Sequence, residues 1–169
     1  MNRIDYLFQT KKERVLSIYV TAGFPKLEDT LPVMEAIQAA GADIIELGIP
    51  YSDPIADGPT IQESNTQALE NGMSIKTLFS QLVGFRAKIH VPVILMGYLN
   101  PIIQFGVEEF CKKCKEVGVD GLILPDLPMS QYLEEYKALF EEYGLFISFL
   151  ISPQTSEKRI REVDENSSG

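Results

Sequence analysis

Three carboxylates stand close together in the stretch ELGIPYSDPIADGPTIQ, which covers residues 46–62. Glu46 lies inside an apolar run, where burying a charge without a partner is costly. Asp53 and Asp57 follow on a segment punctuated by proline and glycine. Because a carboxyl group in a partly apolar pocket can serve as an acid and then as a base, Glu46 is a candidate catalytic residue.

The position of Glu46 on its strand also suits a functional site. Side chains alternate along a strand, so Ile45, Leu47 and Ile49 share one face, which should pack against helices. Glu46 lies on the other face, near the C-terminal end of the strand, where barrels of βα units build their active sites. Alternation along the preceding strand places Tyr19 on the same inner face, beside Glu46.

Each of these acids also has a structural alternative. Glu46 could be a buried acid whose charge is satisfied by a neighbouring hydroxyl or backbone amide. Asp57 begins an Asp-Gly-Pro sequence, which is typical of a turn that leads into a helix, so it could be a turn or cap residue. Asp53 before Pro54 allows the same interpretation. The residues alone leave these alternatives open.

Short apolar runs alternate with amphipathic stretches along the whole chain. Five runs rich in isoleucine, valine and leucine predict buried parallel strands, at residues 15–20, 43–49, 91–96, 119–124 and 145–151. Helical periodicity lies between them, at residues 27–40, 74–89, 107–117, 130–143 and 156–163, with shorter helices expected at 1–10 and 61–70. This alternation is typical of right-handed βαβ units. No linker interrupts it, so residues 1–169 are expected to form a single α/β domain.

The composition is that of a globular protein with an acidic balance. The net charge is -9 and there is no basic stripe, which argues against nucleic-acid binding. No apolar run is long enough to span a membrane and no signal peptide is evident, so we expect a cytoplasmic protein. Cys111 and Cys114 form a C-x-x-C pair, but with His90 as the sole histidine they lack the further ligands of a zinc site. They are interpreted as ordinary helix cysteines in a reducing compartment.

Four stretches carry a resemblance to a known family. They read YVTAGFP from Tyr19, ELGIPYSDPIADGPTIQ from Glu46, LMGYLNP from Leu95 and GLILPDLP from Gly121. In this order, and over essentially the whole chain, they resemble the α subunit of tryptophan synthase, and the second stretch is the most specific. Members of that family are usually longer, and this chain matches their first five βα units.

The resemblance implies a (βα)8 TIM barrel that cleaves indole-3-glycerol phosphate to indole and glyceraldehyde 3-phosphate, a lyase reaction of tryptophan biosynthesis. In this retro-aldol reaction, C3 of the indole is protonated before the C–C bond breaks. The resemblance gives Glu46 the role of acid and base, and Asp57 that of the carboxylate that accepts the indole N–H. Tyr19, Leu95 and Ile123 would line the indole slot, and the family often has phenylalanine where Tyr19 stands.

The resemblance also implies a partner. The family forms an α2β2 complex with a pyridoxal-phosphate β subunit, so the loops at 52–57 and 98–101 are expected contacts. The residues expected at this interface are Asp53, Pro54, Asn100 and Pro101. No metal or organic cofactor is implied for this chain itself. The substrate phosphate sits in the family on loops after the later strands, beyond Gly169, so no residue here is assigned to it.

Two other functions remain open on the sequence. Another sugar-phosphate barrel enzyme, such as an epimerase or isomerase, would place other residues at the strand ends, and the ADGPTIQ loop argues against it. A non-catalytic docking module is the second alternative. Five βα units cannot close an eight-stranded barrel, so we expect residues 1–169 to form an incomplete barrel with two open edge strands and negligible activity alone.

Overall fold

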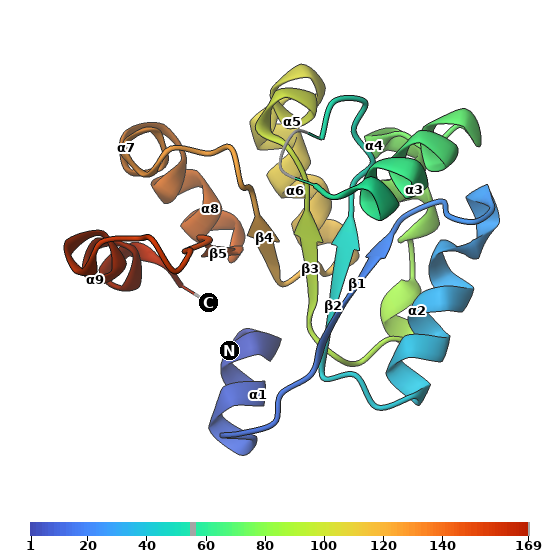
Figure 1. The fold of residues 1–169 in the computed structure, drawn as a ribbon. Helices are drawn as coiled ribbons and strands as arrows, with labels where there is room; N and C mark the ends of the chain where they lie inside the picture. The colour runs from blue at the N-terminus through green and yellow to red at the C-terminus, as the bar shows by residue number, and fades with distance from the viewer. Residues whose placement is uncertain (55–56, 169) are drawn as a thin grey trace.

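The computed structural model describes residues 1–54 and 57–168 of the chain. In this part, five parallel strands form one sheet in the order of the sequence, with β1 and β5 at its two edges (Figure 1). Their bounds are β1 Ser17–Thr21, β2 Ile44–Gly48, β3 Val93–Met96, β4 Gly121–Ile123 and β5 Phe146–Ser148. All five strands that the apolar runs predict are confirmed, each somewhat shorter than its run. The expected α/β architecture is confirmed with them.

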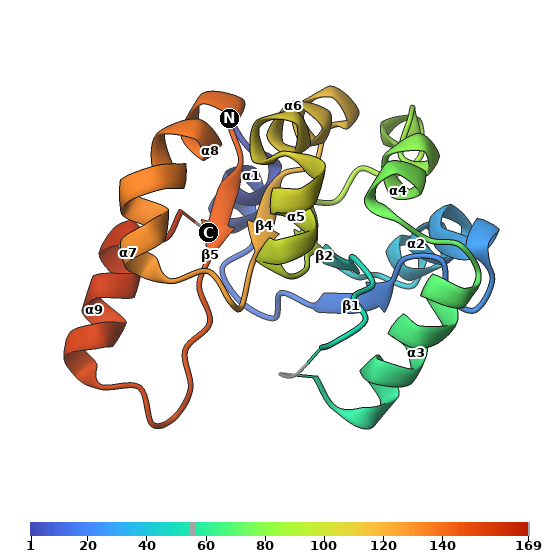
Figure 2. The same ribbon diagram turned by 90° about the horizontal axis from the view of Figure 1, so that it is seen from above.

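The helices follow most of the amphipathic stretches. In chain order the helical elements are α1 Arg3–Thr10, η1 Leu27–Asp29, α2 Thr30–Ala39, α3 Pro59–Glu70, α4 Ile75–Gln81, η2 Phe85–Ala87, α5 Leu99–Phe105, α6 Val107–Val117, α7 Met129–Gln131, η3 Tyr132–Tyr136, α8 Lys137–Tyr143 and α9 Glu157–Asn166. Helices α2, α4, α6 and α8 follow one another along one side of the sheet (Figure 2). Within the described residues, no helix is long and apolar enough to cross a lipid bilayer.

One predicted helix and one predicted loop differ from the structure. The helix expected at 74–89 is divided, because Gly84 adopts a left-handed φ of 74° between α4 and η2. The loop expected at 98–101 is instead the start of α5, which begins at Leu99. Pro101 does not prevent this, because the first turn of a helix tolerates proline.

The register of the strands defines two faces of the sheet. Tyr19 pairs with Glu46, and Glu46 pairs with Ile94, so these three side chains share the inner face. The alternate residues Ile45 and Leu47 are fully buried on the opposite face, in the core formed with the helices. The expected placement of Glu46 on the face away from the helices, beside Tyr19, is therefore confirmed.

Helix α1 closes the lower end of the inner face, where the strands begin (Figure 1). Its residue Ile4 packs with one isoleucine from each of β2, β3 and β4. We call this group the apolar floor; its members are Ile4, Ile44, Ile94 and Ile123. All four side chains are buried. The helix expected at 1–10 is thus confirmed, and it supports the inner face from below.

A buried carboxylate, that of Asp120, connects the elements around the apolar floor. Asp120, which is only 3% exposed, accepts hydrogen bonds from the backbone N–H of Val93 at 2.8 Å and from Arg3 at 2.9 Å. It also pairs with Arg86. Burial lowers the pKa of the Arg86 guanidinium to about 10, and the charge of Asp120 opposes that shift. The network fixes α1 and β3 against β4, so the floor beneath the inner face is held in place.

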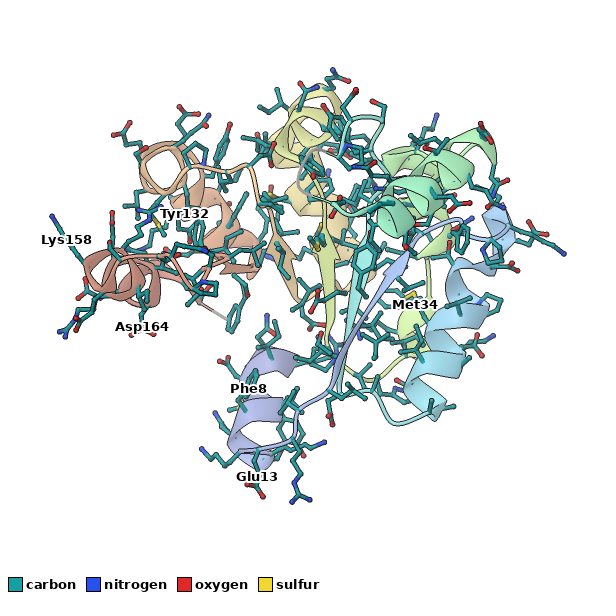
Figure 3. The ribbon with its side chains drawn as sticks, viewed as in Figure 1. Phe8, Glu13, Met34, Tyr132, Lys158 and Asp164 are labelled. Atoms are coloured by element: carbon teal, nitrogen blue, oxygen red, sulfur yellow. The ribbon has the colours of Figure 1, made fainter. Side chains whose placement is uncertain are left out.

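The opposite face carries the larger core. Met34 is fully buried and points from α2 toward the sheet, whereas Lys158 and Asp164 point outward from α9 (Figure 3). Cys111 and Cys114 are free and buried on α6, which agrees with their interpretation as ordinary helix cysteines. Burial raises the pKa of the Cys111 thiol to about 12, so it carries almost no thiolate at neutral pH.

Candidate active site

Glu46 lies on the inner face of the sheet as expected, but at the middle of β2 and not near the C-terminal end of the strand. Its carboxylate is partly buried and accepts a hydrogen bond of 2.6 Å from the hydroxyl of Ser17 on β1. Ile44 on β2 and Ile94 on β3, its neighbours on this face, belong to the apolar floor. The carboxylate therefore lies at the boundary between the apolar floor and the polar upper part of the inner face.

Tyr19 stands next to Glu46 and leans toward the C-terminal end of β2. A Cβ atom on Gly48 would lie 2.1 Å from the Tyr19 hydroxyl oxygen, so only glycine leaves room for the phenol. Thr21 Oγ1 donates to the Tyr19 hydroxyl at 3.4 Å and shares a hydrogen bond of 2.7 Å with Ser64 on α3. These contacts fix the phenol between Glu46 and α3.

Electrostatics links the Tyr19 hydroxyl to both candidate carboxylates. Burial raises the pKa of the phenol above its ordinary value, and the negative charges of Asp57 and Glu46 raise it further. The hydrogen bond from Thr21 acts in the opposite direction and is weaker than the effect of burial. The phenol therefore stays protonated at neutral pH and keeps a proton to donate.

Asp57 contacts a second phenol, that of Tyr98, at the upper end of the site. The Tyr98 hydroxyl donates to Asp57 Oδ2 at 3.4 Å, and the Tyr98 ring stacks on Tyr51 with 4.8 Å between the ring centres. Helix α3 begins at Pro59 with Gly58 as its N-cap, and no side chain caps it. The alternative that Asp57 caps this helix is therefore wrong, and its carboxylate is directed to a phenol instead.

Tyr98 is a residue of this site that the sequence analysis did not single out. It follows β3 and precedes α5, whose first N–H groups need acceptors. Asp126, after β4, supplies an acceptor for the first of them: both of its carboxylate oxygens accept from the N–H of Leu99, at 2.9 and 3.0 Å. The segment after β4 thus holds the start of α5, and with it Tyr98. The signal in the sequence was a polar side chain directly after an apolar strand, where barrels place functional groups.

The two apolar residues expected to line the indole slot lie on different faces. Ile123 pairs with Met96, and both lie on the inner face with Glu46. Leu95 pairs with Leu47 and is fully buried against the helices. The expectation for Leu95 is wrong, because side chains alternate along β3 and it is the neighbouring Met96 that faces inward.

A groove holds most of the residues expected at the partner interface. It has a volume of about 520 Å³ and lies between the segment after β2, the start of α4, and α5. Asp53, Asn100 and Pro101 line it, whereas Pro54 is buried and does not. The Ser52 hydroxyl donates to Asp53 Oδ2 at 2.6 Å, which holds the carboxylate in place. The groove adjoins the site on the inner face, because Tyr51, which stacks on Tyr98, also lines it.

The inner face offers proton transfer and hydrogen bonding. Its upper part brings together two carboxylates, those of Glu46 and Asp57, and two phenols, those of Tyr19 and Tyr98. Across residues 1–54 and 57–168, no group of three or more histidine, cysteine, aspartate or glutamate side chains is arranged to hold a metal ion.

Comparison with known sequences gives one consistent family. A sequence model described as tryptophan synthase alpha chain matches residues 7–169. The tryptophan synthase alpha chain of Flavobacterium psychrophilum is 57% identical to this chain over 169 residues, and that of Flavobacterium johnsoniae is 56% identical. Each match covers 100% of this chain and 66% of the relative, so the chain spans just under two thirds of their length.

Solved structures agree with the sequence relatives. The tryptophan synthase subunit alpha from Legionella pneumophila superposes with a TM-score of 0.93 at 39% identity, over 100% of this chain and 66% of that one. The aminoacrylate-bound form of tryptophan synthase from M. tuberculosis gives 0.92 at 30% identity, over 100% and 69%. The five βα units described here are therefore part of a TIM barrel, as expected.

Proposed function

Because the chain belongs to the tryptophan synthase alpha chain family, we propose that the complete protein is a lyase of tryptophan biosynthesis that cleaves indole-3-glycerol phosphate to indole and glyceraldehyde 3-phosphate. The observation that carries the proposal is the placement of two carboxylates around one phenol. Glu46 pairs in register with Tyr19, and the charges of Glu46 and Asp57 both act on the Tyr19 hydroxyl. Cleavage of this substrate needs one carboxyl group that gives and takes a proton, and a second that stabilises the positive charge on the ring.

Glu46 would perform the proton transfers. As a carboxylic acid it gives a proton to C3 of the indole, which leaves positive charge on the ring. The Glu46 carboxylate then takes the proton of the glycerol hydroxyl next to the scissile bond. The electron pair of that O–H bond forms the C=O bond of the aldehyde. The electron pair of the C–C bond returns to the ring, which departs as neutral indole. The protons balance, since Glu46 loses one and regains one.

Asp57 would stabilise the charge that develops on the ring. Its carboxylate accepts a hydrogen bond from the indole N–H, which strengthens as the ring becomes positive. The contact with Tyr98 holds the carboxylate at the upper end of the site. Tyr19, Ile123 and Met96 would form the apolar walls around the indole, since all three lie on the inner face.

Product analysis tests this function. We expect the complete protein, incubated with indole-3-glycerol phosphate, to release indole and glyceraldehyde 3-phosphate in equal amounts. A sugar-phosphate isomerase or epimerase would convert its substrate without releasing indole, and a docking module would convert nothing. The absence of indole under conditions in which the protein is folded would therefore reject the lyase proposal.

We also propose that the groove lined by Asp53, Asn100 and Pro101 faces a tryptophan synthase β subunit in an α2β2 complex. Pyridoxal phosphate would be bound by that partner. Within this proposal, the Asp53 carboxylate and the Asn100 amide are polar contacts at the edge of the interface, since both residues are exposed and line one groove. The complete protein is expected to bind a matching β subunit in gel filtration.

The double variant Asp53→Ala/Asn100→Ala is expected to weaken that binding by about tenfold in calorimetry, because each side chain contributes polar contacts at the interface. Its matched control is Asp164→Ala/Asn166→Ala, which changes the same residue types on α9. Equal affinity of the two double variants would place the interface elsewhere.

We place the reaction in the cytoplasm, in keeping with two cysteines that are buried and free. Residues 1–169 alone are proposed to turn over no measurable substrate. The loops that bind the substrate phosphate are expected in the remaining third of the family's length, and this chain matches only 66% of its relatives.

A further inference from the structure

Strand β1 presents three hydroxyl groups to the inner face, those of Ser17, Tyr19 and Thr21. Two of them are accounted for, because Thr21 bonds both the Tyr19 phenol and Ser64 on α3. Ser17 is different. Its hydroxyl donates to Oε1 of Glu46 at 2.6 Å, and among the described residues this is its one side-chain hydrogen bond.

Ser17 is exposed on the edge strand β1, so its surroundings neither require nor exclude a hydroxyl. Ser17 pairs in register with Ile44, which belongs to the apolar floor with Ile4 and Ile94. The observation that singles out this serine is its short hydrogen bond to Glu46.

The hydrogen bond also determines where the Glu46 carboxylate lies. Tyr19 is the register partner of Glu46, and Ser17 comes two residues earlier, so the bond runs diagonally toward the N-terminal ends of the strands. Hydrogen bonds from a hydroxyl to a charged carboxylate are short and strong, and 2.6 Å lies in their range. A glutamate side chain has several rotamers, and this contact selects among them.

We propose that Ser17 is a positioning residue for Glu46 in the proton transfers of the lyase reaction, an inference that rests on the proposed function. By restraining the carboxylate, the Ser17 hydroxyl sets the position from which it reaches the two substrate atoms that exchange a proton. Without that restraint the carboxylate spreads over several rotamers. Misplacement of a catalytic group by about 1 Å can cost on the order of 100-fold in rate.

The test compares Ser17→Ala with Ser17→Thr in the complete protein. Ser17→Ala is expected to lower kcat for indole formation by about fivefold to twentyfold with KM changed less than about twofold, because Ser17 acts on the acid and not on the substrate. Ser17→Thr keeps the hydroxyl and fits a strand, so it is expected to restore kcat. The matched control is Ser80→Ala, whose exposed hydroxyl donates to the Thr77 carbonyl within α4.

Glu46→Gln, measured in parallel, separates failure of this inference from failure of the proposed function. If Glu46→Gln is inactive while Ser17→Ala keeps the wild-type kcat, the positioning role is rejected and the lyase assignment stands. A higher kcat in Ser17→Ala, or Ser17→Thr behaving like Ser17→Ala, also rejects it. If Glu46→Gln remains active, the proposed function itself fails. Thermal unfolding of each variant shows whether a loss of rate reflects a loss of folded protein.

Discussion

Replacing Glu46 with glutamine is expected to lower indole formation by the complete protein about 10³- to 10⁴-fold. Glutamine has the shape of glutamate and can still accept the hydrogen bond from Ser17, which is 2.6 Å long in the present structure. It cannot give a proton to C3 of the indole or take one from the glycerol hydroxyl. The loss should therefore fall on kcat, with little change in KM or in the thermal midpoint.

The matched control for this variant is Glu134→Gln, which makes the same change at an exposed position of η3. It is expected to retain the wild-type rate. Activity of Glu46→Gln close to that of the control would remove Glu46 from the chemistry. Glu46 would then be a buried acid satisfied by a neighbouring hydroxyl, which is the structural alternative that its sequence context allows.

Asp57→Asn is expected to reduce kcat by about 10²- to 10³-fold, because the charge that stabilises the positive indole ring is removed. The asparagine keeps an oxygen that can accept the hydrogen bond from Tyr98, which is 3.4 Å in length for the aspartate. Asp57 does not cap α3, so the fold should be unaffected. A steady-state indole assay together with thermal unfolding measures both expectations.

The control for Asp57 is Asp164→Asn on the outer side of α9, which should match the wild type in rate and stability. The opposite pattern for Asp57→Asn would show that Asp57 is a turn residue: a lower thermal midpoint with an unchanged rate per folded molecule. Such a result would leave Glu46 as the sole carboxylate assigned to the reaction.

The strands and their faces could be predicted from the sequence because two periodicities agree. Apolar runs locate the strands, and alternation within the second run separates Glu46 from Ile45 and Leu47. The pairing of Tyr19 with Glu46 follows when adjacent strands share one face. The local sequence pattern and the fold agree here, so the inner-face position of Glu46 could be predicted without the structure.

Leu95 shows where the pattern fails. The third run, VPVILM, is apolar at every position, so alternation cannot tell which residues face inward. The register with β2 decides it: Leu95 pairs with Leu47 toward the helices, and Met96 pairs with Gly48 on the inner face. A strand that is buried on both faces carries no signal for its orientation.

Contacts between distant segments could not be predicted from the sequence either. The hydrogen bond between Ser17 and Glu46 and that between Tyr98 and Asp57 join residues that are far apart in the chain. No local propensity specifies such pairs, because they depend on strand register and on the start of α5. The carboxylates of the site could therefore be predicted from the sequence, whereas the hydroxyl groups that bind them could not.

The most direct test of the retro-aldol account is the mass of the indole that the complete protein forms in heavy water. The carboxyl proton of Glu46 exchanges with solvent, so the account predicts indole with one deuterium on C3, bound to carbon and retained after return to ordinary water. Glyceraldehyde 3-phosphate should form in equal amount. Indole without carbon-bound deuterium, or labelled indole released by Glu46→Gln at the wild-type rate, would contradict the account.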